Sequence, residues 1–413
     1  MFQNVSDSVG KTLYNDLRTE RIKLFVGTLC NENCEFCYYT DYVKINTNSS
    51  LTFLKKQLKW ARSMGAKDVD FSGGEPTIHK DLPDLINYTK ELGFRNIAVI
   101  SNGIRTADPK FFMKLVDSGL NDILLSVHGS TSTIHDQLTR FPGSFNKMLL
   151  TLQNAKDSGI KLRTNTVITA KNYNDILNTT NLLFKYEPYA MNYLMFNDWW
   201  SPNEQVNLMP DFELTSKFIK QSIDQIKYVV PKITVRYMPL CYMEGYEKYI
   251  CDFPQINYDD DEWNLAIQTF LADYGFVVPK NTVYGFVKMA RGLAKFLKTI
   301  GGYPGVDFLL KHKKILMKFI PSEKISDENF KEPYFKTKEC SGCSLNNLCD
   351  GIKTEYDKLY PDYRIYPRAG KPIIDPMYFR GPYLRTLRSE KDETNIGKKG
   401  GTSILQSYSS TRE

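Results

Sequence analysis

The chain has 413 residues, of which 42% are hydrophobic and 24% are charged, and its formal net charge is +7. This composition is ordinary for a globular protein, and the length allows one large domain plus a smaller one. The sequence has neither the pattern of a signal peptide nor an apolar run near the roughly 18 residues of a membrane span. We therefore expect a cytoplasmic protein, and the modest charge says little about its partners.

Six predicted strands alternate with six amphipathic helices. The strands are expected at 21–30, 67–77, 96–105, 121–130, 160–169 and 190–200. The helices are expected at 50–65, 81–94, 108–120, 144–159, 172–188 and 211–230. Each helix ends near a Gly or Pro, which are common stop signals. Alternation at this spacing predicts an α/β fold whose parallel sheet has right-handed crossovers. A further strand is expected at 233–241.

Three cysteines follow the first predicted strand, in the run GTLCNENCEFCYYT. Cys30, Cys34 and Cys37 can hold three corners of a [4Fe–4S] cluster, whose ligands are normally four cysteines. One iron would then remain open to chelate another molecule. The alternative is a zinc knuckle, but zinc usually takes four protein ligands, and no His or fourth Cys lies nearby. The spacing therefore favours the iron–sulfur cluster.

Glycine and polar residues stand at the ends of the later strands. They are Gly73, Gly74, Glu75, Pro76, Ser101, Asn102, Ser126, His128, Arg163 and Asn165. In a parallel α/β barrel the loops after the strands share one face, and catalytic residues gather on that face. We therefore expect these residues to lie close to the cysteine loop.

This ordered set resembles the radical S-adenosylmethionine (radical SAM) superfamily over about residues 20–200. The resemblance rests on the CxxxCxxC loop with Phe36 before its last cysteine, on the GGEP turn at 73–76 and on the SNG strand end at 101–103. The stretch HGSTSTIHDQLTRFPGSF also resembles the segment that follows the fourth strand in many of these enzymes. The resemblance implies a partial (β/α)6 TIM-like barrel, with a smaller C-terminal extension that binds an auxiliary cluster.

The resemblance also implies a SAM site. Cys30, Cys34 and Cys37 would bind the cluster, and SAM would chelate the open iron. In the GGEP turn, which ends at Pro76, Gly73 and Gly74 would let the backbone approach the methionyl part. The carboxylate of Glu75 would accept from the SAM ammonium group.

Other strand-end residues would bind the rest of SAM. Ser101, Asn102 and Ser126 would hydrogen-bond the ribose and carboxylate, and Arg163, two residues before Asn165, would pair with the carboxylate. The rings of Phe36 and Tyr38 would flank the adenine. For Ser101, Ser126 and Arg163 a structural role remains open, because strand-end polar residues also cap helices. For His128 and His135 a structural or solvated role is preferred.

A second cysteine group lies in the run KECSGCSLNNLCDGI. Cys340, Cys343 and Cys349 resemble the CxxCxxxxxC element of SPASM and twitch extensions, and Cys241 and Cys251 resemble the pair that opens them. The resemblance implies one auxiliary [4Fe–4S] cluster, preferably on Cys241, Cys340, Cys343 and Cys349, with Cys251 free. A competing set uses Cys251 and leaves Cys349 free. A structural zinc site is the alternative, because C-x2-C is also a zinc spacing.

The motifs suggest a division of the chain into four segments. These are a lead-in at 1–20, the barrel at 21–235, the auxiliary-cluster extension at 236–388 with a helical insertion at 252–339, and a disordered tail at 389–413. The insertion begins with acidic residues at 259–262 and continues with a basic amphipathic stretch. Such a stretch can lie on a membrane surface or bind an anion, but a helical lid with solvated lysines is the simpler interpretation.

Three functions are weighed. The preferred one is an oxidoreductase that cleaves SAM to a 5′-deoxyadenosyl radical and abstracts hydrogen from a carbohydrate or other small metabolite, with flavodoxin or ferredoxin as electron donor. The second is a peptide-modifying enzyme, which is less favoured because the barrel begins near Arg21. The third, a zinc-stabilised scaffold, leaves the strand-end residues unexplained. No nucleic-acid partner is expected, because the basic residues form no aromatic-interleaved stripe.

The outcome of the reaction depends on the spare thiol. A free Cys251 or Cys349 facing the barrel mouth would donate a hydrogen atom to the substrate radical and so act in an epimerase. The auxiliary cluster would instead accept an electron. Oxidation is preferred, and Cys251 is retained as the candidate hydrogen donor.

Overall fold

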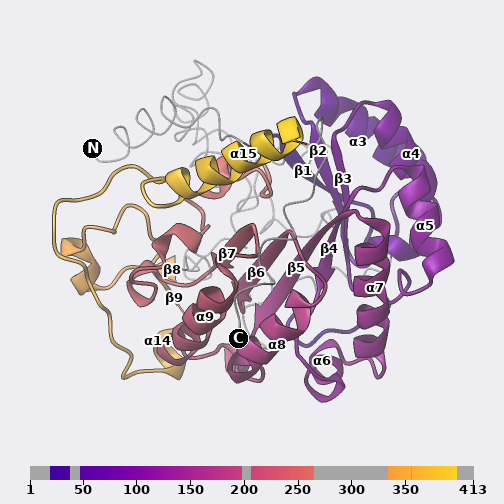
Figure 1. Cartoon of the computed structure of the whole chain (residues 1–413). Helices are drawn as coiled ribbons and strands as arrows, with labels where there is room; N and C mark the ends of the chain where they lie inside the picture. The colour runs from indigo at the N-terminus through magenta and orange to yellow at the C-terminus, as the bar shows by residue number, and fades with distance from the viewer. Residues whose placement is uncertain (1–18, 38–46, 198–205, 265–333, 355, 398–413) are drawn as a thin grey trace, which may run out of the picture.

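The computed structural model describes residues 19–37, 47–197, 206–264, 334–354 and 356–397 (Figure 1). Seven strands form one parallel sheet, in which each strand is hydrogen-bonded to the next one along the chain. They are β1 (Arg21–Phe25), β2 (Asp68–Ser72), β3 (Asn96–Ser101), β4 (Asp122–Ser126), β5 (Lys161–Ile168), β6 (Ala190–Met195) and β7 (Lys232–Arg236). The predicted fold class is confirmed. The strand expected ahead of Cys241 is β7, and it extends the sheet beyond the six strands of the predicted barrel.

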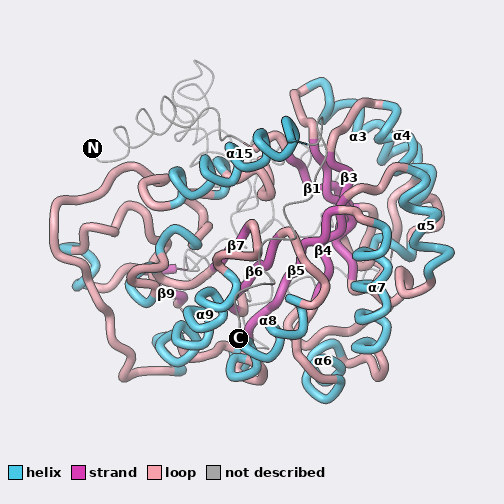
Figure 2. Tube along the Cα trace, in the orientation of Figure 1, coloured by secondary structure: helices cyan, strands magenta, loops and turns pink. Residues whose placement is uncertain are grey.

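The sheet curls, and its helices lie on the outer face (Figures 1 and 2). The six predicted helices are α3 (Leu51–Ser63), α4 (Leu82–Glu91), α5 (Pro109–Ser118), α7 (Ser144–Ser158), α8 (Ile176–Phe184) and α9 (Phe212–Ile226). Capping residues define several of their starts, because side chains such as Ser50 and Asp211 accept from backbone N–H groups in the first turn. A further helix, α6 (Ser132–Thr139), forms within the stretch HGSTSTIHDQLTRFPGSF.

Alternation along the strands separates two environments. On β4, Ile123 and Leu125 belong to the apolar core, whereas Asp122 lies on the opposite face of the strand, where it pairs with Arg163 of β5. On β1 to β3 the core residues contact those of α3 and α4 in a second apolar cluster. The strands therefore present apolar side chains to the helices and polar ones to the inside of the curled sheet.

Residues 252–264 close the end of the barrel at which the strands begin. The Asn264 N–H donates to the Arg21 carbonyl at 2.7 Å, and the Thr19 N–H donates to the Asn257 carbonyl at 3.0 Å. The predicted helical insertion at 252–339 is therefore wrong at its start, because 252–264 belong to the barrel base. The rest of the insertion up to residue 333, including the basic stretch, lies outside the described residues, as does most of the predicted lead-in.

The C-terminal part contains two short strands and two helices. β8 (Tyr334–Phe335) pairs antiparallel with β9 (Ile352–Lys353), and α14 (Tyr356–Leu359) and α15 (Arg380–Gly397) follow. The predicted disordered tail from 389 is wrong in its first part, because α15 continues to Gly397. Residues 398–413 lie outside the described part of the chain. Within that part, no helix is long and apolar enough to cross a membrane.

Candidate functional site

Cys30, Cys34 and Cys37 lie on the loop that follows β1, and all three are partly exposed. Three parts of the chain hold this loop in place. The Glu35 N–H donates to the Leu138 carbonyl of α6 at 2.8 Å, and the Lys171 ammonium lies 2.6 Å from the Glu35 carboxylate. At the end of β3, the Asn102 amide donates to the Asn31 side chain at 2.8 Å. The three thiols therefore sit on a loop anchored by α6, β3 and the segment after β5.

The thiols of this loop are held in a partly desolvated environment. Burial raises the pKa of Cys30 to about 12, and it raises that of Cys34 well above its usual range. Glu32, between them in the sequence, is itself buried, and burial raises the pKa of its carboxyl to about 8. A metal cluster binds thiolates, so cluster binding at this loop must release the thiol protons. Glu32 was not among the predicted site residues, because a glutamate inside a loop has no periodicity that indicates burial.

The glycines of the GGEP turn let two loops pack together. A Cβ on Gly73, whose φ is +137°, would lie 2.2 Å from the Gly27 carbonyl oxygen, and one on Gly74 would lie 2.0 Å from that of Leu29. Both neighbours belong to the segment that leads into the cysteine loop. The chain's own backbone therefore requires glycine at both positions, and the approach of SAM to this turn stays a prediction.

Glu75 ties this turn to the end of β3. Its carboxylate accepts from the Ser101 hydroxyl at 2.9 Å and from the Asn102 N–H at 2.8 Å. It also accepts from the Thr77 N–H at 3.0 Å, and Pro76 begins the short helix η2 (Pro76–Ile78) beside it. Burial raises the pKa of Glu75, while these hydrogen bonds oppose the shift. Glu75, Ser101 and Asn102 thus have structural partners, and their contacts with SAM stay a prediction.

A row of polar side chains lies inside the barrel, on neighbouring strands β4, β5 and β6. Ser126 of β4 is in register with Asn165 of β5, which is in register with Asn192 of β6. All three are half-buried. Within the described part of the chain, none of these three side chains has a hydrogen-bond partner. Neighbouring residues in register point to the same face of a sheet, so the three side chains form a row of unsatisfied donors and acceptors. Sequence reasoning missed Asn192, although the period of two along β6 could have found it.

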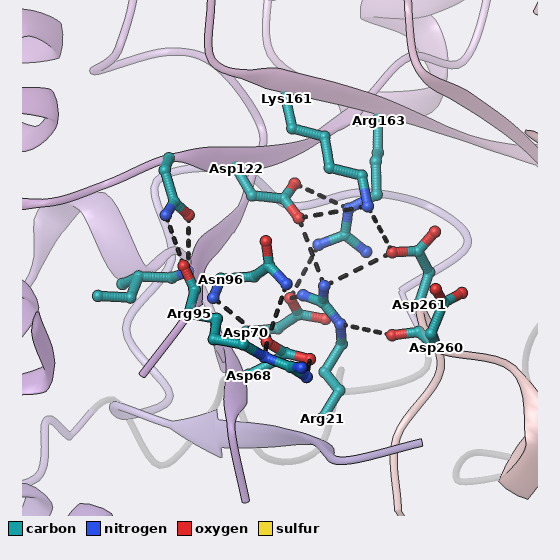
Figure 3. A network of polar contacts seen from close by, with 12 residues as sticks. Arg21, Asp68, Asp70, Arg95, Asn96, Asp122, Lys161, Arg163, Asp260 and Asp261 are labelled. Atoms are coloured by element: carbon teal, nitrogen blue, oxygen red, sulfur yellow. Dashed lines mark hydrogen bonds and ion pairs between the residues drawn. The ribbon is translucent and has the colours of Figure 1, made fainter. Parts of the chain in front are cut away.

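Arg163 lies instead in a network of buried ion pairs (Figure 3). Its guanidinium lies 2.8 Å from Asp70 on β2 and 2.8 Å from Asp122 on β4, and the residue is 1% exposed. Arg21 reaches the same Asp70 carboxylate at 2.6 Å. Burial alone would raise the pKa of Asp70, but Arg163 and Arg21 hold it below its usual value. The prediction that Arg163 pairs with the SAM carboxylate is therefore wrong, because both of its buried contacts are internal ion pairs.

The acidic run at 259–261 completes the network at the barrel base. The Lys232 ammonium contacts Asp259, and it lies 2.9 Å from both Asp260 and Asp261. Arg380, at the start of α15, also pairs with Asp259. The three carboxylates lie close enough together to suggest a metal site. The buried Lys232 ammonium is already the counter-ion of these carboxylates, so we assign them a structural role.

The residues beside the last cysteine are also mainly structural. The Phe36 ring is 9% exposed, and its centroid lies 4.3 Å from that of His128. Burial lowers the pKa of His128 well below its usual range and that of His135 to about 4, so both imidazoles are neutral. The preferred structural role of the histidines agrees with this burial. The structure does not support an adenine contact for Phe36, and Tyr38 lies outside the described residues.

The second cysteine group comes together in the folded chain. Cys241 lies in the short helix η5 (Leu240–Tyr242) after β7, while the other three come from the segment around β9. Burial raises the pKa of Cys241 to about 11, with further contributions from Cys340 and Cys343. Burial likewise raises the pKa of Cys349 to about 12, with a contribution from Cys241. Cys241 thus lies near each of the other three preferred ligands, about 100 residues away in the sequence.

The spacing of these sulfurs bears on the choice of metal. In the described part of the chain, no three cysteine sulfurs lie within 4.8 Å of one another. A tetrahedral zinc site with Zn–S bonds of about 2.3 Å places its sulfurs about 3.8 Å apart. A cubane cluster is larger and needs wider spacing between its ligands. Among the described residues the cysteine sulfurs are not arranged as a tetrahedral zinc site, and the choice of metal at both groups stays a prediction.

Cys251 lies apart from the other cysteines. It is 0% exposed, and its N–H donates to the Val235 carbonyl at 3.0 Å. Burial raises the pKa of its thiol, and the charges around it are those of Arg380 and Asp259 near the barrel base. The competing ligand set that uses Cys251 is therefore wrong. So is the expectation that this thiol faces the barrel mouth as a hydrogen donor.

A curled parallel sheet with a cysteine loop at the carboxyl end of its first strand defines a partial α/β barrel whose rim carries three cysteines. Residues 24–183 match the model of the Radical SAM superfamily, which identifies this part of the chain as a radical SAM domain. The predicted superfamily is confirmed for this part of the chain, and members of that superfamily use SAM and a [4Fe–4S] cluster as cofactors.

Curated relatives match a little more than a third of the chain. Fe-coproporphyrin III synthase from Methanosarcina barkeri is 34% identical over 148 residues, which is 36% of this chain and 36% of the relative. A probable GTP 3',8-cyclase from Metallosphaera sedula is 30% identical over 158 residues, which is 37% of this chain and 48% of the relative. The chain thus spans no more than about half the length of these two relatives.

Solved structures are similar over longer stretches. The anSMEcpe protein with bound AdoMet is 14% identical, with a TM-score of 0.49 over 91% of this chain and 98% of that one. Streptococcus suis SuiB bound to precursor peptide SuiA is 16% identical, with a TM-score of 0.43 over 51% of this chain and 47% of that one.

Proposed function

We propose that this protein is a radical SAM oxidoreductase that acts on a carbohydrate or other small metabolite. The observation that carries the proposal is the rim of the barrel, where a loop with three partly exposed thiols is anchored to the GGEP turn and to the end of β3. When bound there, a [4Fe–4S] cluster and SAM would supply one-electron chemistry and hydrogen abstraction. The electron would come from a donor such as flavodoxin or ferredoxin.

The chain's own residues would bind the cluster and would bind and orient the ligand in the barrel. Cys30, Cys34 and Cys37 would hold the cluster as thiolates. Ser126, Asn165 and Asn192 offer hydroxyl and amide groups on neighbouring strands, and their unsatisfied hydrogen-bonding capacity suits a ligand rich in hydroxyl or carboxylate oxygens. Below this row the ion pairs of the base fill the barrel, which would help to exclude water from the reacting carbon.

We further propose that Cys241, Cys340, Cys343 and Cys349 bind one auxiliary [4Fe–4S] cluster. Oxidation is then favoured over epimerisation for a structural reason. Cys251 is enclosed near the barrel base, and Cys349 lies among the other ligands, so neither offers a thiol at the mouth. An auxiliary cluster would provide an acceptor for the substrate's electron.

The proposal is tested by SAM cleavage. Anaerobically reconstituted protein with dithionite should produce 5′-deoxyadenosine from SAM. Replacing Cys30, Cys34 and Cys37 together by Ala should abolish the product while the circular dichroism spectrum stays unchanged. Cleavage at the native rate by the triple variant would show that this loop does not bind the cluster.

Iron content tests the auxiliary site. Two cubanes imply about eight irons per chain, and the triple alanine variant should keep about four. Cys251→Ala should retain about eight irons, whereas Cys349→Ala should lose up to four, since only Cys349 is a proposed ligand. About four irons plus one zinc in the intact protein would contradict the auxiliary cluster.

A further inference from the structure

A pocket of about 350 Å³ lies between the start of α9, helix α14 and the turn after α14. Four tyrosines line it: Tyr242, Tyr356, Tyr360 and Tyr363. Figure 1 shows α14 beside α9, and the Phe212 N–H at the start of α9 donates to the Tyr356 hydroxyl at 2.9 Å. The pocket shares no residue with the proposed SAM site.

The tyrosine hydroxyls are largely used within the protein. That of Tyr242 donates to the Arg364 carbonyl at 2.6 Å, and that of Tyr360 donates to the Met209 carbonyl at 2.8 Å. The Tyr356 ring is in ring contact with both Tyr360 and Tyr363, with centroids 4.7 Å and 5.4 Å apart. Tyr356 is 1% exposed and is stacked between Phe212 and Tyr360, so the half-buried Tyr360 and Tyr363 offer most of the ring surface in the pocket. The face of an aromatic ring carries partial negative charge.

Three carboxylates, those of Asp211, Glu213 and Asp362, complete the wall. Asp211 caps α9, and Glu213 accepts from the Tyr366 hydroxyl at 3.0 Å. Each carboxylate oxygen has two lone-pair sites, so these oxygens keep capacity for another donor. The one cationic side chain in the lining is the exposed Arg364. Lys217, outside the lining, lies 3.4 Å from the Glu213 carboxylate, so three carboxylates face two cations. The remaining negative charge, together with the aromatic rings, makes a pocket that attracts cations.

The pocket adjoins the second cysteine group. Tyr242 follows Cys241 directly in the chain, and the charge of Cys340 contributes to the raised pKa of Tyr363. A ligand held in the pocket would therefore lie beside the proposed auxiliary cluster.

We propose that this pocket binds an alkylammonium group of the size of a lysine side chain. Its volume is at the lower end of the range for ligand pockets, about 300–1,000 Å³, which suits a single side chain or a small free amine. The proposal goes beyond the radical SAM reaction and concerns binding alone. It can therefore fail while the proposed function stands, and the reverse is also true.

The test uses the reconstituted full-length protein and three probes in isothermal titration. N-acetyl-lysine methylamide should bind at least tenfold more tightly than N-acetyl-norleucine methylamide, which has a similar shape but no charge. The third probe, n-butylamine, distinguishes the source of the ammonium group. Equal affinity for butylamine indicates a free amine, and weaker affinity indicates a peptide. Norleucine binding equal to that of lysine would overturn the proposal.

Matched variants locate the site. Tyr360→Leu, which removes the ring, should weaken lysine binding at least fivefold, whereas Tyr360→Phe should preserve it. Replacing Glu213 and Asp362 together by Gln and Asn should also weaken binding, and Arg364→Gln should strengthen it. The double variant Asp84→Asn, Glu91→Gln on α4 is the control for lost negative charge elsewhere. If that control weakens binding as much as the pocket variant, the effect is one of net charge and the site is wrong.

Discussion

The two ends of the barrel interior use polar residues in opposite ways. At the base, Arg21, Asp70 and Arg163 are almost fully buried, and their charges pair with one another. Toward the rim, Asn165 and Asn192 are neutral, half-buried and without side-chain partners in the described part of the chain. Arg163 and Asn165 are two residues apart on the same face of β5. Polarity inside a barrel therefore does not by itself mark a binding site, and the proposal for the rim rests instead on side chains without partners in the protein.

The physical reason is the cost of burying charge. A charge removed from water must be compensated by a partner with good geometry, and the loss of one partner leaves an uncompensated charge. The base meets this requirement with residues from five strands and from the 252–264 segment. The rim avoids it by using neutral amides and hydroxyls, which can exchange water for a ligand at low cost.

The largest effect on stability is expected from Arg163→Met at the barrel base. Removing one partner of a buried ion pair should lower the free energy of unfolding by about 3–5 kcal/mol. Chemical denaturation followed by circular dichroism measures this change. SAM affinity of the folded fraction should stay the same, since Arg163 does not reach the rim. A large loss of SAM affinity at unchanged stability would restore the original prediction for this residue.

Asn165→Ala is the matched change at the other end of the same strand. It should alter the free energy of unfolding by no more than about 1 kcal/mol, because the side chain has no partner to lose. If Asn165 binds SAM, equilibrium dialysis should show weaker affinity. The reverse pattern, with Asn165→Ala destabilising and Arg163→Met harmless, would invalidate the distinction between base and rim.

The next effect concerns the cysteine loop. Gly74→Ala places a methyl group 2.0 Å from the Leu29 carbonyl oxygen, so the loop must move. We expect the variant to lose most of the iron of the first site and to keep about four irons at the second. Gly342→Ala is the control within the other cysteine group, because its Cβ would meet nothing within 4 Å. Full iron content in Gly74→Ala would show that the close approach of the two loops is dispensable.

The smallest effect is a change in the response to acid. The ion pairs of the base hold the pKa values of Asp70 and Asp259 below their unfolded values, near 3.9. Their contribution to stability is therefore complete above about pH 4 and is lost as the pH falls through the lowered folded values. Asp259→Asn should flatten the acid limb of stability against pH, while Asp84→Asn on the surface should leave it unchanged. An unaltered acid limb in Asp259→Asn would mean that the base does not control acid stability.

Some features of this protein follow from local sequence alone. Cys30, Cys34 and Cys37 lie within eight residues, so their proximity requires no knowledge of the fold. The parallel sheet and its helices follow from periodicity and end signals, which act over one element at a time. The need for glycine at 73 and 74 was also visible, although not its cause, because the colliding backbone comes from another loop.

Other features depend on which residues, far apart in the sequence, come into contact in the folded chain. Arg163 and Asn165 look equivalent in the sequence, yet Asp70 and Asp122, from two other strands, make the first an internal ion-pair partner. The sequence preferred Cys349 over Cys251 as a ligand but left both open, and the fold placed Cys251 near the charges of the barrel base and Cys349 near Cys241. Spacing along a chain constrains only neighbours in sequence. The packing of β7, β9 and the 252–264 segment decided, through burial and charge pairing, which polar groups were satisfied and which were left available for ligands.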